Sequence, residues 1–146
     1  MTLIEISLLL VGLSLVACVV VQAIHTDLAF GLSYGASVRD EERSTALSRR
    51  LARVVRNQVE GVALFLPLVI LADGRASSAS NAEALSAACL LYAISRPIHG
   101  LLHAIGAGWP RSVVWLLGLC ALLAGYSQVV LGVNVVDAND LSGRKK

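Results

Sequence analysis

The chain has 146 residues, of which 56% are hydrophobic and only 15% are charged, and its formal net charge is +2. A soluble domain usually has about 25% charged residues, so this chain has too little polar surface for a water-soluble globule. The composition predicts a membrane protein in contact with the lipid bilayer, and the net charge is too small to indicate nucleic-acid binding.

Four segments are long and apolar enough to cross a bilayer as helices. We predict an all-α fold, a four-transmembrane-helix bundle that forms one integral membrane domain over residues 1–136, with helices at about 3–25, 48–72, 81–104 and 111–134. A crossing needs about 20 residues, and backbone groups in lipid must be satisfied within the segment, which favours helices. Residues 137–146 are predicted to form a polar tail.

The first span, Ile6–Ile24, contains no charged residue. A signal peptide is the alternative interpretation, but Met1–Glu5 contains no basic residue and the apolar run is longer than the usual signal core. We therefore expect a helix that is retained in the protein.

Basic residues in the connections predict how the chain is oriented. Those in or beside the first and third connections are Arg39, Arg43, Arg49, Arg50, Arg53, Arg56, Arg96 and Arg111, against Arg75, Arg144, Lys145 and Lys146 on the other side. The positive-inside rule places the richer side in the cytoplasm. We expect a multi-pass protein with both termini on the non-cytoplasmic side.

The second span is unusual because polar residues occupy its first half. On a helix, an arc of roughly 100° contains four of them, namely Arg53, Arg56, Asn57 and Glu60. Ionisable groups at membrane depth are costly and therefore face a bundle interior or a wet cavity. This helix face is therefore predicted to line a binding pocket.

A second polar face follows on the third span. Within roughly 60° of that helix the sequence places Tyr92, Arg96, His99 and His103, and Arg111 and Ser112 follow after the short third connection. Three helices thus bring polar groups to one membrane depth. Glu60 is the one acidic residue available to these arginines, so an ion pair with Arg53 or Arg96 that only locks the bundle is an alternative interpretation.

Two other kinds of site are not expected. His99 and His103 are one turn apart, but they lack a third ligand motif and Arg96 beside them repels a cation, so we predict no metal site. Ser112, His103 and Asp40 could be combined into a hydrolytic triad, but no nucleophile elbow surrounds Ser112.

In the fourth span, Gly118, Gly125 and Gly132 recur every seven residues. Such a stripe predicts close approach of another helix, within the subunit or between subunits.

The polar groups suit an anionic ligand with one cationic end. Glutathione fits this description, because it has two carboxylates, an ammonium group and a thiol. Arginines would clamp its carboxylates, and Glu60 would bind the ammonium. Arg111 and Ser112 are suitably placed to favour the thiolate, which is the reactive form of a thiol.

These residues resemble the signature of the MAPEG family, the membrane-associated proteins in eicosanoid and glutathione metabolism. The pattern Arg53-x-x-x-Asn57-x-x-Glu60 is similar to the signature on the second helix of the family. The run Arg96-x-x-His99-x-x-x-His103 and the later Arg111-Ser112 resemble the prostaglandin-E synthase of the family. The likeness covers nearly the whole chain.

The resemblance, which is to the bacterial-type members, implies a homotrimer, in a bacterial inner membrane, with glutathione as co-substrate bound between neighbouring subunits near the cytoplasmic face. It implies that glutathione is bound by Arg53, Arg56, Asn57, Glu60, Arg96, His99 and His103, and that Arg111 and Ser112 are catalytic. His103 stands where the family often has a tyrosine, and Trp115 replaces a tyrosine of the prostaglandin enzyme. These departures argue against eicosanoid synthesis.

We therefore expect a glutathione-dependent transferase or peroxidase that acts on lipophilic electrophiles or lipid hydroperoxides. A non-catalytic membrane scaffold or modulator of the same fold is the alternative. A small proton-coupled exporter is a third possibility, since a membrane carboxylate such as Glu60 suits a proton relay, but the surrounding arginines favour its ionised form.

Overall fold

The computed structural model describes residues 1–38, 43–72 and 79–143, and the side chains of residues 1–38, 43–72 and 81–131. Over these ranges the regular elements are all helices: α1 (Leu3–Phe30), α2 (Leu32–Gly35), α3 (Ala46–Ala72), α4 (Ala79–Ile105) and α5 (Gly108–Gly143). The four long helices each contain a segment that is long and apolar enough to cross a membrane. The predicted all-α bundle of four membrane-spanning helices is confirmed.

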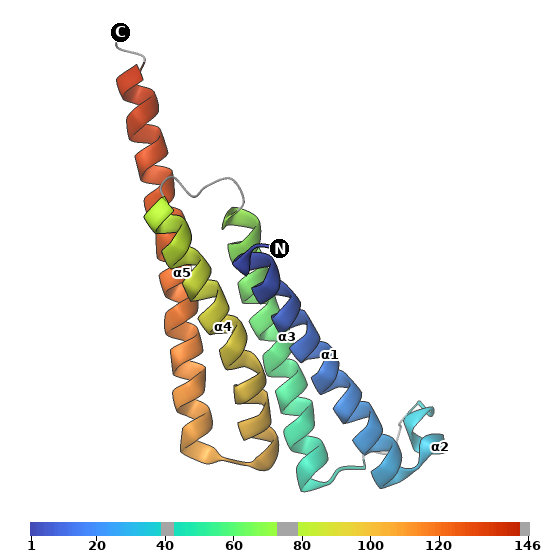
Figure 1. The fold of residues 1–146 in the computed structure, drawn as a ribbon. Helices are drawn as coiled ribbons and strands as arrows, with labels where there is room; N and C mark the ends of the chain where they lie inside the picture. Colours follow the sequence, from blue (N-terminus) through green and yellow to red (C-terminus); the bar gives the residue numbers. More distant parts are fainter. Residues whose placement is uncertain (39–42, 73–78, 144–146) are drawn as a thin grey trace.

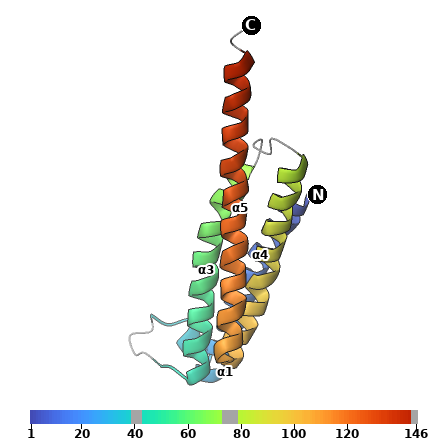
Figure 2. The ribbon, with the colours of Figure 1, turned by 90° about the vertical axis from the view of Figure 1, so that its left-hand side faces the viewer.

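The four long helices form a bundle in which α3 and α4 lie between α1 and α5 (Figure 1). Helix α4 packs on α5, α1 and α3, and α1 packs on α3 and α4, whereas α1 and α5 make no contact within the described residues. The turn between α4 and α5 lies at the same end of the bundle as α2, and the last part of α5 projects beyond the opposite end (Figures 1 and 2). We call the end that carries α2 and the α4–α5 turn the loop end.

Two helices are longer than the apolar pattern predicts. Helix α1 continues past residue 25 to Phe30 and stops at Gly31, whose φ of 87° suits a glycine. Helix α5 continues to Gly143 instead of ending near 134, so residues 137–143, predicted as a tail, prolong the helix. The end of an apolar run therefore does not mark the end of the helix, because the helical backbone hydrogen bonds continue through the polar residues that follow.

Local capping fixes the helix ends at the loop end. The Thr45 hydroxyl accepts a 3.0 Å bond from the Ser48 N–H, and the Ser48 hydroxyl accepts a 2.7 Å bond from the Thr45 N–H, so the start of α3 is capped reciprocally. After α4, Gly106 has a φ of 80° and the Ala107 N–H donates to the Leu102 carbonyl at 2.9 Å. This is a Schellman turn, and it brings the start of α5 beside the end of α4.

The apolar core lies farther from the loop end than the polar faces do. Its buried members are Val11, Phe65, Leu68, Ala72, Leu85, Cys89, Tyr92, Ala93, Ala121, Leu122 and Val129. Phe65 stacks on Tyr92 with ring centroids 5.0 Å apart. Many other large apolar side chains are exposed on the outer faces, as expected for helices whose solvent is lipid.

The glycine stripe of α5 packs inside the subunit. A Cβ atom on Gly118 would lie 2.5 Å from the Ser95 hydroxyl of α4, and one on Gly125 would lie 2.7 Å from a Leu68 methyl of α3. A side chain at either position would force Ser95 or Leu68 to shift, because the neighbouring helices approach closely. Gly132 lies outside the described side chains.

Candidate functional site

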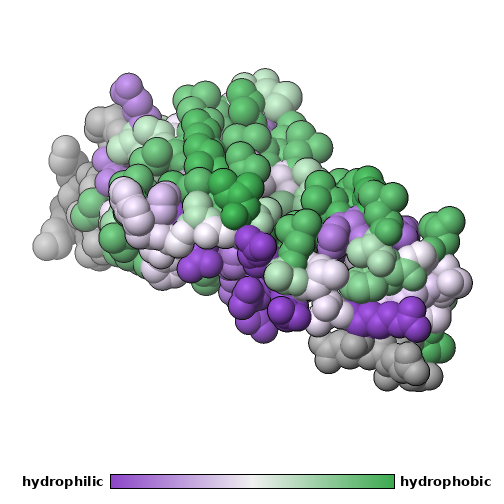
Figure 3. All heavy atoms as spheres, turned by 90° about the horizontal axis from the view of Figure 1, so that it is seen from below, coloured by the Kyte–Doolittle hydropathy of each residue, from purple (hydrophilic) through white to green (hydrophobic). Residues whose placement is uncertain are grey.

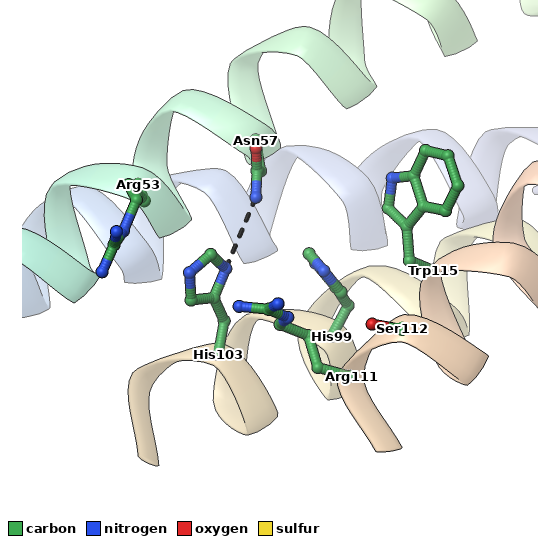
Figure 4. Close-up of a pocket in the computed structure, with 7 residues that line it drawn as sticks. All are labelled: Arg53, Asn57, His99, His103, Arg111, Ser112 and Trp115. Atoms are coloured by element: carbon green, nitrogen blue, oxygen red, sulfur yellow. Dashed lines mark hydrogen bonds between the residues drawn. The ribbon is translucent and has the colours of Figure 1, made fainter. Parts of the chain in front are cut away.

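A polar cavity of about 530 Å³ opens between α3, α4 and α5 near the loop end. Its wall is formed by Arg53, Asn57, His99, His103, Arg111, Ser112 and Trp115 (Figure 4). Six of these seven residues were predicted from the sequence to belong to one site. We call this space the polar cavity.

The two histidines of α4 form the floor of the polar cavity. His99 is 4% exposed and His103 is 6% exposed, and their rings meet edge to face with centroids 5.8 Å apart. His103 shares a 3.4 Å contact between its Nδ1 and the Asn57 amide nitrogen. Within the described residues His99 has no hydrogen-bond partner, and its ring points into the space between the helices (Figure 4). A buried imidazole without a partner is costly, so this ring is available to a ligand or to water.

Two arginines approach the polar cavity from opposite helices. Figure 4 shows the Arg111 side chain reaching from α5 toward His103, with Arg53 on the α3 side. Neither guanidinium has an ion-pair partner or a hydrogen-bond acceptor among the described side chains and backbone groups. Ser112 donates only a long bond, 3.5 Å, to the Gly108 carbonyl. The cavity therefore offers unpaired cations and a weakly engaged hydroxyl, which favours an anionic ligand.

A smaller space, about 120 Å³, continues from this region toward the apolar core. It is lined by Asn57, Glu60, Gly61, Leu64, Tyr92, Arg96, Trp115, Leu119 and Leu122, and we call it the inner cavity. Asn57 and Trp115 line both cavities. Glu60 and Arg111 thus lie in adjoining spaces rather than in one pocket.

Arg96 is buried and held by α3. Its Nη2 donates to the Asn57 carbonyl at 2.5 Å and its Nε donates to the Gln58 Oε1 at 3.2 Å. Its guanidinium also lies 5.7 Å from the centroid of the Tyr92 ring. A Cβ on Gly61 would come within 2.8 Å of the guanidinium carbon, so the glycine leaves room for Arg96.

Gln58, which the sequence analysis did not select, completes this arrangement. It is 1% exposed, and its amide nitrogen donates to the Arg96 carbonyl at 2.9 Å and to the Ser14 hydroxyl at 3.3 Å. It lies outside the 100° arc that groups the other polar residues of α3, because it faces α1 and α4. The signal available in the sequence was a polar residue on a helix face whose other members, three and four positions away, are apolar: Val54, Val55, Gly61 and Val62.

Glu60 pairs with Arg56 rather than with Arg53 or Arg96. The Arg56 Nε to Glu60 Oε1 distance is 3.9 Å, and both side chains are more than half exposed. Arg56 is not part of the wall of either cavity. The alternative interpretation from the sequence, an ion pair between Glu60 and Arg53 or Arg96, is therefore not the arrangement found.

No group of three or more metal-ligating side chains occurs in the part of the chain that the structure describes. His99 and His103 have arginines as their neighbours in the polar cavity. The charges that line the polar cavity therefore attract an anion and repel a cation.

Comparison with protein families gives one match, to the model described as MAPEG family, over residues 3–131. The match includes all four membrane-spanning segments and both cavities. No curated protein and no solved structure matches the chain.

Proposed function

The chain belongs to the MAPEG family, and from this premise we propose that it is a membrane-bound, glutathione-dependent transferase or peroxidase. Its second substrate would be a lipophilic electrophile or a lipid hydroperoxide that reaches the site through the bilayer. Family membership supports a glutathione-linked activity in general, and the choice of substrate class rests on the cavities.

The observation that carries the proposal is the polar cavity with two guanidiniums that have no partner among residues 1–38, 43–72 and 79–143. Arg53 and Arg111 line it from different helices, and a guanidinium can bind a carboxylate through two parallel hydrogen bonds. A peptide with two carboxylates and a thiol matches this charge. The inner cavity, with Leu64, Leu119 and Leu122 in its wall, supplies an adjoining apolar surface for a lipophilic reactant.

The residues have distinct proposed roles. Arg53, Asn57, His99 and His103 would bind glutathione in the polar cavity, while Arg111 and Ser112 would act on its sulfur. The guanidinium of Arg111 favours the thiolate over the thiol, and the Ser112 hydroxyl donates a hydrogen bond to the sulfur anion. Glu60, in the wall of the inner cavity, and its partner Arg56 would bind the peptide beside the polar cavity, since both side chains are exposed.

Arg96 has a different proposed role from the one that the resemblance implies. Its Nη2 and Nε are engaged with α3, and we assign it to positioning Asn57, whose side chain lines both cavities.

Either reaction balances with glutathione as the nucleophile. In transfer, the sulfur forms a bond to carbon while the leaving group departs with its electron pair. In peroxide reduction, two glutathione thiols supply two electrons and two protons, which gives an alcohol, water and a disulfide.

The proposal includes a homotrimer in which a neighbouring subunit closes the polar cavity. The exposed position of Arg56 and Glu60 beside the cavities supports this, because charged groups at membrane depth are usually covered by protein. Light scattering in detergent, corrected for bound detergent, would give three chains per particle.

The orientation proposed from the loop charges places the polar cavity near the cytoplasmic face. Cysteine-free variants with one cysteine added after residue 143 would then react with an impermeant thiol reagent from the non-cytoplasmic side.

The deciding experiment is a titration of the purified full chain with glutathione. We expect heat of binding, a rise in thiolate absorbance in the ultraviolet, and conjugation of a model aryl halide. S-Methylglutathione is the matched control, because it should bind without any thiolate signal. Folded protein that shows neither binding nor turnover would contradict the proposal.

A further inference from the structure

A second polar cavity, about 270 Å³ in volume, lies at the loop end on another flank of α3. It is lined by Gln22, Thr26, Phe30, Tyr34, Arg43, Ser44, Ser48, Arg49 and Ala52, and we call it the α1–α3 cavity. It shares no lining residue with the polar cavity. Figure 3, which looks onto this end of the molecule, shows hydrophilic residues gathered between hydrophobic ones.

Two arginines in the wall of the α1–α3 cavity are held in place. Arg49 donates from Nη1 to the Ser44 hydroxyl at 3.0 Å. The Arg43 guanidinium lies 5.3 Å from the centroid of the Tyr34 ring, and its backbone N–H donates to the Tyr34 hydroxyl at 2.9 Å. Contacts of this kind reduce the freedom that a long side chain loses when it binds a ligand.

The rest of the polar wall carries uncharged groups, mostly hydroxyls. Hydroxyls come from Thr26, Tyr34, Ser44 and Ser48, of which Thr26 and Ser48 already donate to the Gln22 and Thr45 carbonyls. The Ser44 hydroxyl accepts from Arg49, and the start of α3 adds the positive end of a helix dipole. None of the described lining residues is acidic. The nearby carboxylate of Asp27 lies against Gly35 instead. This combination of guanidiniums, hydroxyls and a helix start suits a phosphate group.

The position of the cavity indicates where such a phosphate would come from. Phe30 and Tyr34 meet edge to face, with centroids 5.3 Å apart, at the end of a membrane span, where aromatic residues typically meet the lipid headgroups. Gln22 and Thr26 continue toward the membrane on the same face of α1 as Val19, which is 46% exposed. A lipid with its headgroup in the cavity would lay an acyl chain along this face.

We propose that the α1–α3 cavity binds the phosphate group of an anionic phospholipid. The volume of the cavity is somewhat below the range of about 300–1,000 Å³ that is usual for small-molecule pockets, so the cavity fits a headgroup and leaves the acyl chains outside. The inference is independent of glutathione, because the residues involved lie outside both the polar cavity and the inner cavity. Free phosphate carries the same chemistry, and the test separates the two sources.

The test uses the full chain in phosphatidylcholine nanodiscs with Arg49→Gln and Arg50→Gln as a matched pair. Both variants remove one positive charge from the same turn of α3, but only Arg49 lines the cavity, whereas Arg50 turns toward Gly106. Short-chain phosphatidic acid is titrated into each protein and binding is measured by native mass spectrometry. We expect Arg49→Gln to weaken binding at least tenfold and Arg50→Gln to change it less than twofold.

Three controls complete the design. Arg49→Lys should restore part of the affinity, and glutathione binding should be unchanged in Arg49→Gln, which would show that the fold is intact. Competition by millimolar inorganic phosphate that depends on Arg49 would support a site for the phosphate group and would identify free phosphate as a second source. Equal losses in Arg49→Gln and Arg50→Gln, or no binding by the unaltered protein, would overturn the proposal.

Discussion

Arg96 and Arg111 are cations on neighbouring helices, yet their surroundings differ. Arg96 is 5% exposed, donates to the Asn57 carbonyl and to Gln58, and rests against Gly61. Arg111 lines the polar cavity without an acceptor in the described part of the chain. The Arg96 guanidinium therefore has its hydrogen-bond partners within the protein, whereas the Arg111 guanidinium is available to a ligand.

The comparison shows that charge type alone does not identify a ligand-binding residue in a membrane helix. A buried guanidinium must be hydrogen-bonded, and a helix carbonyl can serve that need as well as a ligand can. Arg53 and Arg111, which have no acceptor among the described residues, are therefore the better candidates for binding an anion. Four substitutions test this distinction.

Arg111→Leu should have the largest effect. Removal of one group that stabilises a developing anion usually lowers turnover by about 100- to 1,000-fold, or about 3–4 kcal/mol. The melting temperature in detergent should stay unchanged, because Arg111 has no hydrogen-bond acceptor or ion-pair partner in the described part of the chain. Turnover of the aryl halide and thermal unfolding measured on the same sample check this, and Arg111→Lys should retain part of the activity. If the variant loses stability instead, Arg111 supports the fold as Arg96 does, and the distinction between the two arginines is wrong.

Arg96→Leu should give the opposite pattern. The substitution removes two hydrogen bonds from a charged donor and leaves the side-chain amide oxygen of Gln58 without its donor. It should therefore destabilise the protein by about 2–3 kcal/mol. The readout is the shift of thermal unfolding in detergent, with Arg96→Lys as an intermediate case. If the protein keeps its stability but loses glutathione affinity, Arg96 binds the ligand directly, as the resemblance to the family implies.

Arg53→Gln should weaken glutathione binding by about tenfold, or about 1.4 kcal/mol. The reason is that Arg53 contributes to binding in the polar cavity without touching the sulfur, so KM should rise while kcat changes little. Calorimetry and steady-state kinetics measure the two effects. Arg50→Gln, which removes a charge one turn away, is the control and should leave both constants unchanged.

Glu60→Gln should have the smallest effect of the four substitutions. Its pair with Arg56 spans 3.9 Å between exposed side chains, and such pairs contribute about 0–1 kcal/mol. Stability and particle size should therefore persist, while glutathione affinity falls a few-fold. Loss of the oligomer on size-exclusion chromatography would instead favour the non-catalytic scaffold, in which the charged groups serve assembly alone.

Much of this arrangement could be predicted from the sequence. Apolar length located four membrane helices, and angular position on α3 and α4 brought Arg53, Asn57, His99 and His103 to one side. The separation of Glu60 and Arg96 into an inner cavity could not be predicted in this way. Helical angles show which residues share a face, but the neighbour opposite each residue depends on the packing of the bundle.

The role of Gln58 was missed for a related reason. Its value comes from Ser14 and Arg96, which lie 44 and 38 positions away in the sequence. The extent of α5 was missed because hydropathy reports contact with lipid, whereas a helix can continue into water when its residues permit. Pairing between distant residues and the behaviour of polar helix ends both need the three-dimensional structure.

Helix α3 receives hydrogen bonds on successive turns from side chains of its neighbours. Arg96, Tyr92 and Tyr126 donate to the carbonyls of Asn57, Gly61 and Leu64, at 2.5, 2.8 and 2.8 Å. In lipid, apolar side chains alone give a helix little preference for one azimuth over another. These three hydrogen bonds fix the rotation of α3 about its own axis, two of them from α4 and one from α5. Arg53 and Asn57 are therefore held in their orientation toward the polar cavity before any substrate binds.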